Sequence, residues 1–113
     1  MSDIALRVPG TRARLRVRTA AAWRGAVGLL GNRDLRDPHG LWVRSCRRIH
    51  TYGLNNAVDV VFLRADGVVA KVVESMKPWR SSSCPEASTV LELRAGLVQR
   101  LNIAPGLALD LLA

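Results

Sequence analysis

The chain has 113 residues, of which 49% are hydrophobic, so it is long enough for one domain with its own core and too apolar for extended disorder. Its net charge of +8 comes almost wholly from arginine, because Lys71 and Lys77 are its only lysines. No uncharged apolar run is long enough to span a membrane, and residues 1–10 lack the apolar centre of a signal peptide, which predicts a cytoplasmic protein.

The excess of arginine has two explanations. A basic surface often marks an anionic partner such as nucleic acid or a membrane, since neutralising phosphates releases bound counterions. An arginine-rich, lysine-poor and alanine-rich composition also arises from GC-rich coding without any such partner. The few aromatic residues do not interleave with the arginines, as a platform for stacking single strands would require. We favour the compositional explanation and keep an anionic polymer or a protein as the alternative partner.

The first predicted elements are a flexible N-terminal segment, 1–10, and a strand, Thr11–Thr19, which opens a single β-rich domain over 11–113. Four arginines alternate with apolar residues in this strand and therefore share one face. These four residues, which we call the arginine stripe, are Arg12, Arg14, Arg16 and Arg18. The pattern is typical of an edge strand that charge keeps soluble, and the alternative is a face that binds an anionic partner.

A short helix, a turn and a strand are expected next. Thr19 is a candidate N-cap for a helix that continues to Ala26 and that Gly31 would end. The Pro and Gly residues of Asp34–Gly40 predict a turn. A short strand, Leu41–Arg44, should follow this turn.

Two β-branched runs, Val58–Leu63 and Val68–Val73, predict an antiparallel hairpin joined by the turn residues Arg64–Gly67. The first run is nearly all apolar, as in a strand buried on both faces, and Asp59 is its one carboxylate. A buried carboxylate needs a partner or a proton. We expect a structural ion pair or a clamp on backbone groups; if Asp59 instead faces a pocket beside His50, it is a binding residue.

The C-terminal part begins with a polar loop, Arg80–Pro85, and a strand, Thr89–Arg94. One or two helical turns over Ala95–Leu101 and a terminal strand, Leu107–Leu112, follow. Together these elements predict a mainly β fold, a small antiparallel β-sandwich or barrel-like domain with one or two short helices.

Five residues around the start of the buried hairpin are the candidate binding residues. They are Trp42, Cys46, His50, Thr51 and Asp59. A Cys46 thiolate activated by His50 would also be a nucleophile if the two met and a third group oriented the imidazole. On a strand, residues four apart lie about 13 Å from each other, so contact requires a bend. We expect structural roles and assign no catalytic residue.

Metal binding would need three or four converging ligands. The available set, Cys46, Cys84, His39 and His50, matches no familiar zinc spacing, so we predict no metal and no cofactor. A disulfide between Cys46 and Cys84 would close a long loop and stabilise the fold by about 4 kcal/mol. The expected cytoplasmic location argues against it.

The sequence also contains a set of ordered blocks. They are Gly28-Leu29-Leu30-Gly31, Gly40-Leu41-Trp42, Cys46 with Ile49-His50-Thr51, Val58 to Leu63, Pro78-Trp79-Arg80, and Val90-Leu91-Glu92-Leu93 with Ala95-Gly96. In order and spacing they resemble the bacterial family called domain of unknown function 192. The resemblance implies a compact, mostly antiparallel β-sandwich or barrel-like fold with short helices, and it implies no activity. The chain departs from the family pattern at Leu54, Ala57 and Leu107, where the family favours Met, Pro and an acidic residue.

Two functional classes follow from these observations. We favour a non-catalytic binding or accessory domain that presents a small pocket near His50 and Asp59, or the arginine stripe, to a protein or an anionic partner. The alternative is an enzyme or a metal site built on Cys46, His50 and Asp59. Convergence of those three side chains within about 4 Å of one point would favour the alternative.

Overall fold

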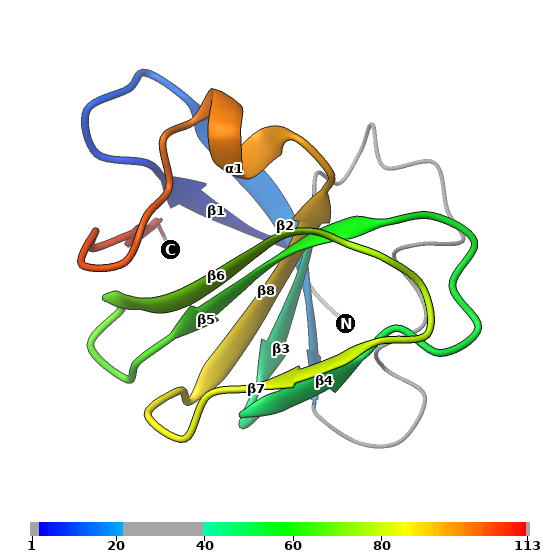
Figure 1. Ribbon diagram of the computed structural model, residues 1–113. Coiled ribbons are helices and arrows are strands. Elements are labelled where there is room, and N and C mark those ends of the chain that lie inside the picture. Colours follow the sequence, from blue (N-terminus) through cyan, green and yellow to red (C-terminus); the bar gives the residue numbers. More distant parts are fainter. Residues whose placement is uncertain (1–2, 22–39, 113) are drawn as a thin grey trace.

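The computed structural model describes residues 3–21 and 40–112. These residues form the strands and the short helix that Figure 1 labels. In chain order the elements are β1 (Asp3–Arg7), β2 (Arg14–Ala21), β3 (Gly40–Arg44), β4 (Arg48–His50), β5 (Val58–Leu63), β6 (Val69–Met76), β7 (Ser81–Ser83), β8 (Thr89–Arg94), α1 (Leu97–Arg100) and β9 (Asp110–Leu112). The mainly β fold with a short helix that the sequence predicts is confirmed.

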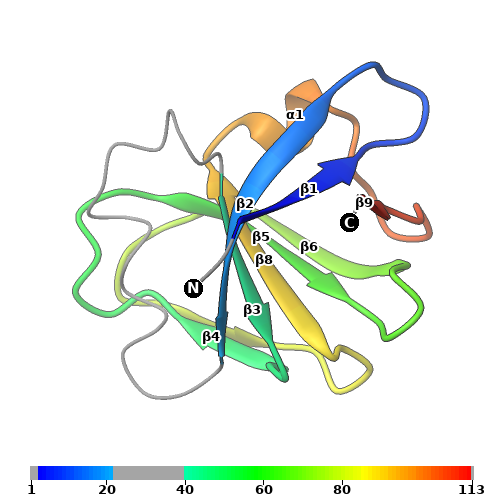
Figure 2. The same ribbon diagram turned by 180° about the vertical axis from the view of Figure 1, so that it is seen from behind.

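Seven of these strands form one sheet, in the order β6-β5-β8-β3-β2-β1-β9, and β4 pairs with β7 in a second sheet. Neighbours in the large sheet are antiparallel except β2 and β3, which run parallel. The large sheet is curled, as the two opposite views in Figures 1 and 2 show. The N–H groups of Gly106 and Leu109 donate to the carbonyl oxygens of Val69 and Gly67. These bonds hold the segment before β9 against the start of β6, so the sheet curls into a half-barrel.

The fold has two apolar cores, one on each face of the central strands. The core inside the curl, which α1 covers, includes Leu6, Val17, Val61, Leu91, Leu93 and Val98. The core between the large sheet and the β4–β7 sheet includes Leu41, Ile49, Val60, Phe62, Cys84 and Val90. Residues of β5 and β8 alternate between the two cores, which explains why both strands are buried on both faces.

The β5–β6 hairpin forms as predicted. The Gly67 N–H donates to the Arg64 carbonyl oxygen (2.9 Å), and Gly67 has a φ of 85°, which explains a glycine at this position of the turn. Lys71, on β6, donates from Nζ to the Ser83 carbonyl oxygen of β7 (3.0 Å). A single lysine therefore ties the hairpin to the small sheet.

Several elements differ from the sequence predictions. Residues 3–7, inside the segment expected to be flexible, form β1, whose Leu6 is buried. Strand β2 is not an edge strand, because it pairs with β1 on one side and β3 on the other. It continues to Ala21, where the sequence favours a helix; the rest of that helix and the turn before Gly40 lie outside the described residues. Ser81–Ser83, which we predict as loop, form β7.

Two of these differences, those at β7 and β2, have separate physical causes. Strands β4 and β7 have three residues each, too few to show a periodic pattern, and they are defined by pairing with each other. Parallel pairing such as that of β2 with β3 needs a long crossover connection, which no local pattern reveals. In the part of the chain that the structure describes, no helix has the length and apolar character that a membrane span requires.

Candidate functional site

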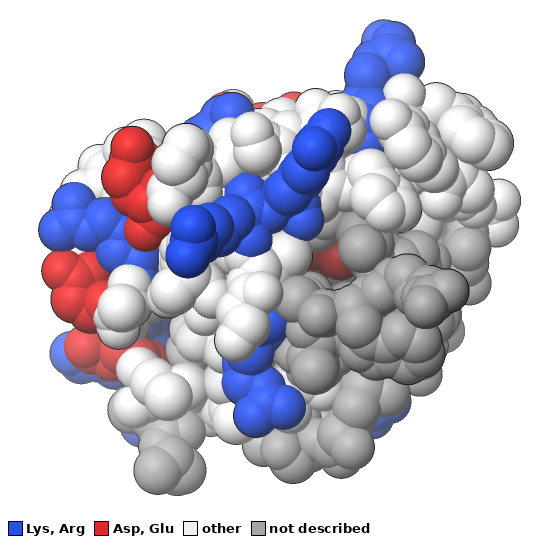
Figure 3. Space-filling model, turned by 90° about the horizontal axis from the view of Figure 1, so that it is seen from below, with Lys and Arg blue, Asp and Glu red and all other residues white. Residues whose placement is uncertain are grey.

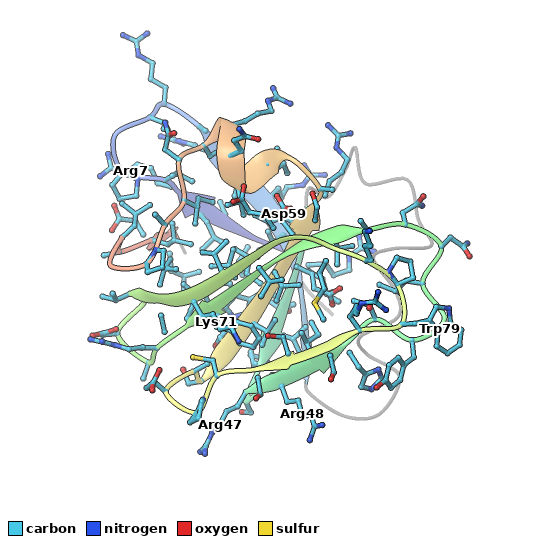
Figure 4. The ribbon with its side chains drawn as sticks, viewed as in Figure 1. Arg7, Arg47, Arg48, Asp59, Lys71 and Trp79 are labelled. Carbon is cyan, nitrogen blue, oxygen red and sulfur yellow. The ribbon has the colours of Figure 1, made fainter. Side chains whose placement is uncertain are left out.

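Asp59 lies within β5 and is 1% exposed. Its Oδ1 accepts a hydrogen bond from the Ser75 N–H (2.8 Å), and its Oδ2 accepts from the Gly96 and Val98 N–H groups (3.0 Å each). These donors belong to the end of β6 and to the start of α1, where Figure 4 shows the side chain. Ser75 and Gly96 both have positive φ, 49° and 99°. Asp59 is therefore a clamp that holds two irregular backbone segments together.

Cys46 is 7% exposed and donates its S–H to the Arg48 carbonyl oxygen (3.0 Å). Burial raises the pKa of the thiol, and the Glu92 carboxyl raises it further, so the sulfur stays protonated at neutral pH. Cys46 and Cys84 are both buried and free. Within residues 3–21 and 40–112, no three His, Cys, Asp or Glu side chains are grouped as metal ligands; His39 lies outside these ranges.

Thr51 follows β4 and is completely buried. Its Oγ1 donates to the Lys77 carbonyl oxygen (2.6 Å) and accepts from the Arg80 N–H (2.9 Å). Its backbone N–H donates to the Arg80 carbonyl oxygen (2.8 Å), and its own carbonyl oxygen accepts from the Trp79 N–H (3.0 Å). One threonine thus fastens the segment 77–80 to the end of β4.

Three aromatic rings, those of His50, Tyr52 and Trp79, stack beside this junction, and we call them the aromatic column. The ring centroids of His50 and Tyr52 are 4.9 Å apart, with 23° between the planes. Those of Tyr52 and Trp79 are 5.8 Å apart, with 24° between the planes. Tyr52 is 52% exposed and Trp79 is 66% exposed. Large aromatic side chains normally contribute to cores and interfaces, so this exposed stack of rings is a candidate binding surface.

The backbone conformation of Trp79 supports this interpretation. Its φ of 65° lies in the left-handed region, which is a genuine outlier for a bulky residue and costs about 1–2 kcal/mol. The hydrogen bonds of Thr51 to Trp79 and Arg80 hold the chain in this conformation. Such strain persists only where the surrounding structure imposes it, and it is concentrated at functional sites. Figure 4 shows this side chain at the edge of the molecule.

Three basic residues are close to the rings of the column along the chain. Arg48 shares a face of β4 with His50, because Ile49 between them is buried in the core. Lys77 and Arg80 are exposed on either side of Trp79 in the chain. Figure 3 views the molecule from the side of β4 and β7; Lys and Arg side chains cross the middle of this face, and most of the acidic surface lies towards one edge. The set that we call the aromatic-basic surface consists of Arg48, His50, Tyr52, Lys77, Trp79 and Arg80.

The arginine stripe belongs to another part of the fold. Arg12 precedes β2, the next two arginines of the stripe are exposed, and Arg18 is half-buried. Arg14 lies opposite Arg7 of β1, whose guanidinium is paired with the Asp110 carboxylate (3.0 Å). The stripe therefore has an acidic residue, Asp110, as well as basic ones in its neighbourhood.

Trp42, on β3, is half-buried and lines a cavity of about 690 Å³. The walls include two ion pairs, Arg7 with Asp110 (3.0 Å) and Arg64 with Asp66 (3.2 Å). A backbone hydrogen bond and the one from Arg64 hold the pKa of Asp66 below its ordinary value. The other four candidate binding residues do not line this cavity. The five candidates therefore do not form one site.

Glu92, on β8, is one of the residues that were not singled out from the sequence. It is completely buried, between Leu41 of β3 and Val60 of β5 in the sheet register. Neither carboxyl oxygen has a hydrogen-bond partner among the described residues, and burial raises the pKa of the group to about 8. The signal was present in the sequence, because Glu92 interrupts an apolar strand as Asp59 does.

The sequence and the fold also match known proteins. The model of the family DUF192, described as an uncharacterized ACR, matches residues 5–111. A candidate transcription regulator of Sinorhizobium meliloti is 24% identical in sequence, with a TM-score of 0.80 over 96% of this chain and 92% of that one. A protein of unknown function from Novosphingobium aromaticivorans is 23% identical, with a TM-score of 0.75 over 96% and 84% of the two chains. Both similarities establish a shared fold. No curated protein matches the chain.

Proposed function

The chain belongs to the DUF192 family, and from that premise we propose that it is a non-catalytic binding domain whose ligand surface is the aromatic-basic surface. The family description names no activity, so the proposal depends on the geometry of the chain itself. One observation carries it: three exposed rings are stacked in a column, and three exposed basic residues lie within two residues of these rings along the chain. Its ligand is an anionic polymer. We expect the protein to be cytoplasmic.

The buried groups favour binding over catalysis. The two oxygens of Asp59 accept hydrogen bonds from backbone amides, and the thiol of Cys46 donates to a backbone carbonyl. His50 is exposed and stacks on Tyr52. An enzyme or metal site built on Cys46, His50 and Asp59 would need these groups to give up their present contacts, which makes it the weaker proposal.

The proposal is tested with an anionic polymer and paired charge reversals. Wild type and two double variants, Arg48→Glu/Lys77→Glu and Arg12→Glu/Arg14→Glu, are titrated with polyphosphate at low salt. Both variants change the net charge equally, so a general charge effect weakens both to the same extent. We expect the Arg48/Lys77 variant to lose at least about tenfold more affinity than the other. An equal loss of affinity in both variants, or a larger loss in the Arg12/Arg14 variant, would contradict the proposed binding surface.

A further inference from the structure

We infer that the polymer is single-stranded nucleic acid, with a base stacked on the aromatic column and phosphates beside the basic side chains. This inference rests on the proposed function and names its ligand. The rings and the cations come from two segments, the end of β4 and the segment 77–80, which Thr51 joins.

The geometry of the column favours a flat ligand. Tyr52 stacks with both neighbours, so His50 and Trp79 are the two ends. Trp79 is 66% exposed, and a further ring placed against it continues the column. Nucleobases stack on exposed tryptophan and tyrosine in proteins that bind single strands, with little dependence on sequence. In a duplex the faces of the bases are already stacked, which favours single strands here.

The charges complete the match. Arg48 and His50 are two residues apart on β4 and are exposed on the same face. Lys77 and Arg80 lie on either side of Trp79 in the sequence. On β7, Ser81 and Ser83 pair with His50 and Arg48 in the sheet register, so their exposed hydroxyls lie on the same side of the small sheet. Guanidinium, ammonium and hydroxyl groups are the usual donors to phosphate oxygens. Rings beside such donors match a chain of bases linked by phosphates better than a polymer of phosphate alone.

Contacts within the domain hold the column in place without a ligand. The buried side chain of Thr51 fixes the backbone on both sides of Trp79, and stacking fixes Tyr52 between two rings. A surface that is already ordered loses less conformational entropy on binding. These contacts distinguish the column from scattered exposed aromatic residues.

The inference is tested by fluorescence anisotropy with three probes of equal length: fluorescein-labelled dT12, a matched oligomer of abasic sugar phosphates, and a dT12·dA12 duplex. We expect dT12 to bind about 5- to 150-fold more tightly than the abasic oligomer, the range for one stacked base. Trp79→Ala should remove this preference, and Trp79→Phe should keep most of it. Leu111→Ala, at an exposed apolar position outside the column, is the matched control and should change nothing.

The salt dependence separates stacking from charge. Three phosphate contacts predict a slope of about −2 for the logarithm of affinity against that of salt, and Trp79→Ala should keep this slope while lowering affinity. Urea titration of each variant shows whether it is folded. Equal affinity for dT12 and the abasic oligomer would overturn the inference and leave the proposed function intact. Tighter binding of the duplex would also overturn it, and no binding of any probe or of polyphosphate would overturn both.

Discussion

Glu92 makes a quantitative prediction about stability. Its carboxyl is completely buried without a hydrogen-bond partner among the described residues, and its pKa in the folded state is about 8, above the ordinary 4.5. The folded protein therefore holds a proton that the unfolded chain releases, so stability from this group is fully present below about pH 4.5 and is lost as the pH rises through 8. From 1.36 kcal/mol per pKa unit, the loss is about 3 kcal/mol at pH 7 and approaches about 5 kcal/mol at higher pH.

Glu92→Gln replaces the carboxyl by a neutral group of the same shape. The free energy of unfolding of the variant should match that of the wild type near pH 4.5 and exceed it by about 3 kcal/mol at pH 7. The assay is urea unfolding at pH 4.5, 6, 7 and 8.5, in which the other titrating groups cancel in the difference. Glu74→Gln, at an exposed position of β6, is the control and should give a small difference at every pH. A difference for Glu92→Gln that does not change with pH would refute the reasoning.

Further variants test the clamps and the strain. Asp59→Asn removes the charge that three backbone N–H groups share and should lower the free energy of unfolding in urea by about 3 kcal/mol; loss of binding with unchanged stability would instead make it a ligand residue. Gly40→Ala places a Cβ 2.5 Å from the Glu92 carbonyl oxygen and should cost about 1–3 kcal/mol in the same assay. Thr51→Val should lower the free energy of unfolding by about 1–3 kcal/mol and lower the fluorescence anisotropy of Trp79. Thr51→Ser keeps the hydroxyl and should leave the free energy of unfolding and the anisotropy unchanged. Trp79→Gly should have a free energy of unfolding about 1 kcal/mol higher than Trp79→Ala, because glycine adopts the left-handed φ without strain. Equal free energies of unfolding would contradict the presence of strain.

Much of the fold was predictable because long apolar runs carry their own pattern. Val58–Leu63 and Thr89–Arg94 were predicted with the bounds that the structure has. The first is an apolar run, as a strand buried between two cores needs, and the second shows the alternation of a strand. The helical turn within Ala95–Leu101 and the hairpin turn at Arg64–Gly67 could also be predicted from the sequence. Their signals are local to a few consecutive residues.

The candidate site was only partly predictable, because it depends on contacts between distant segments. His50 and Thr51 were singled out from the sequence, but Tyr52 and Trp79 were not, since nothing local shows that they stack on each other. The few aromatic residues argued against a stacking platform, and the fold gathers two of them, with His50, at one junction. Trp42 was chosen with the others, yet the chain places it at a separate cavity.

The central claim is that the aromatic-basic surface is the face that binds. Its most direct test is a set of 1H–15N NMR spectra recorded while unlabelled dT12 is added to the labelled protein at low salt. The largest shifts should fall on the amides of 48–52 and 77–83 and on the Trp79 indole N–H. Shifts confined to the arginine stripe, or to the cavity that Trp42 lines, would contradict this placement of the binding face.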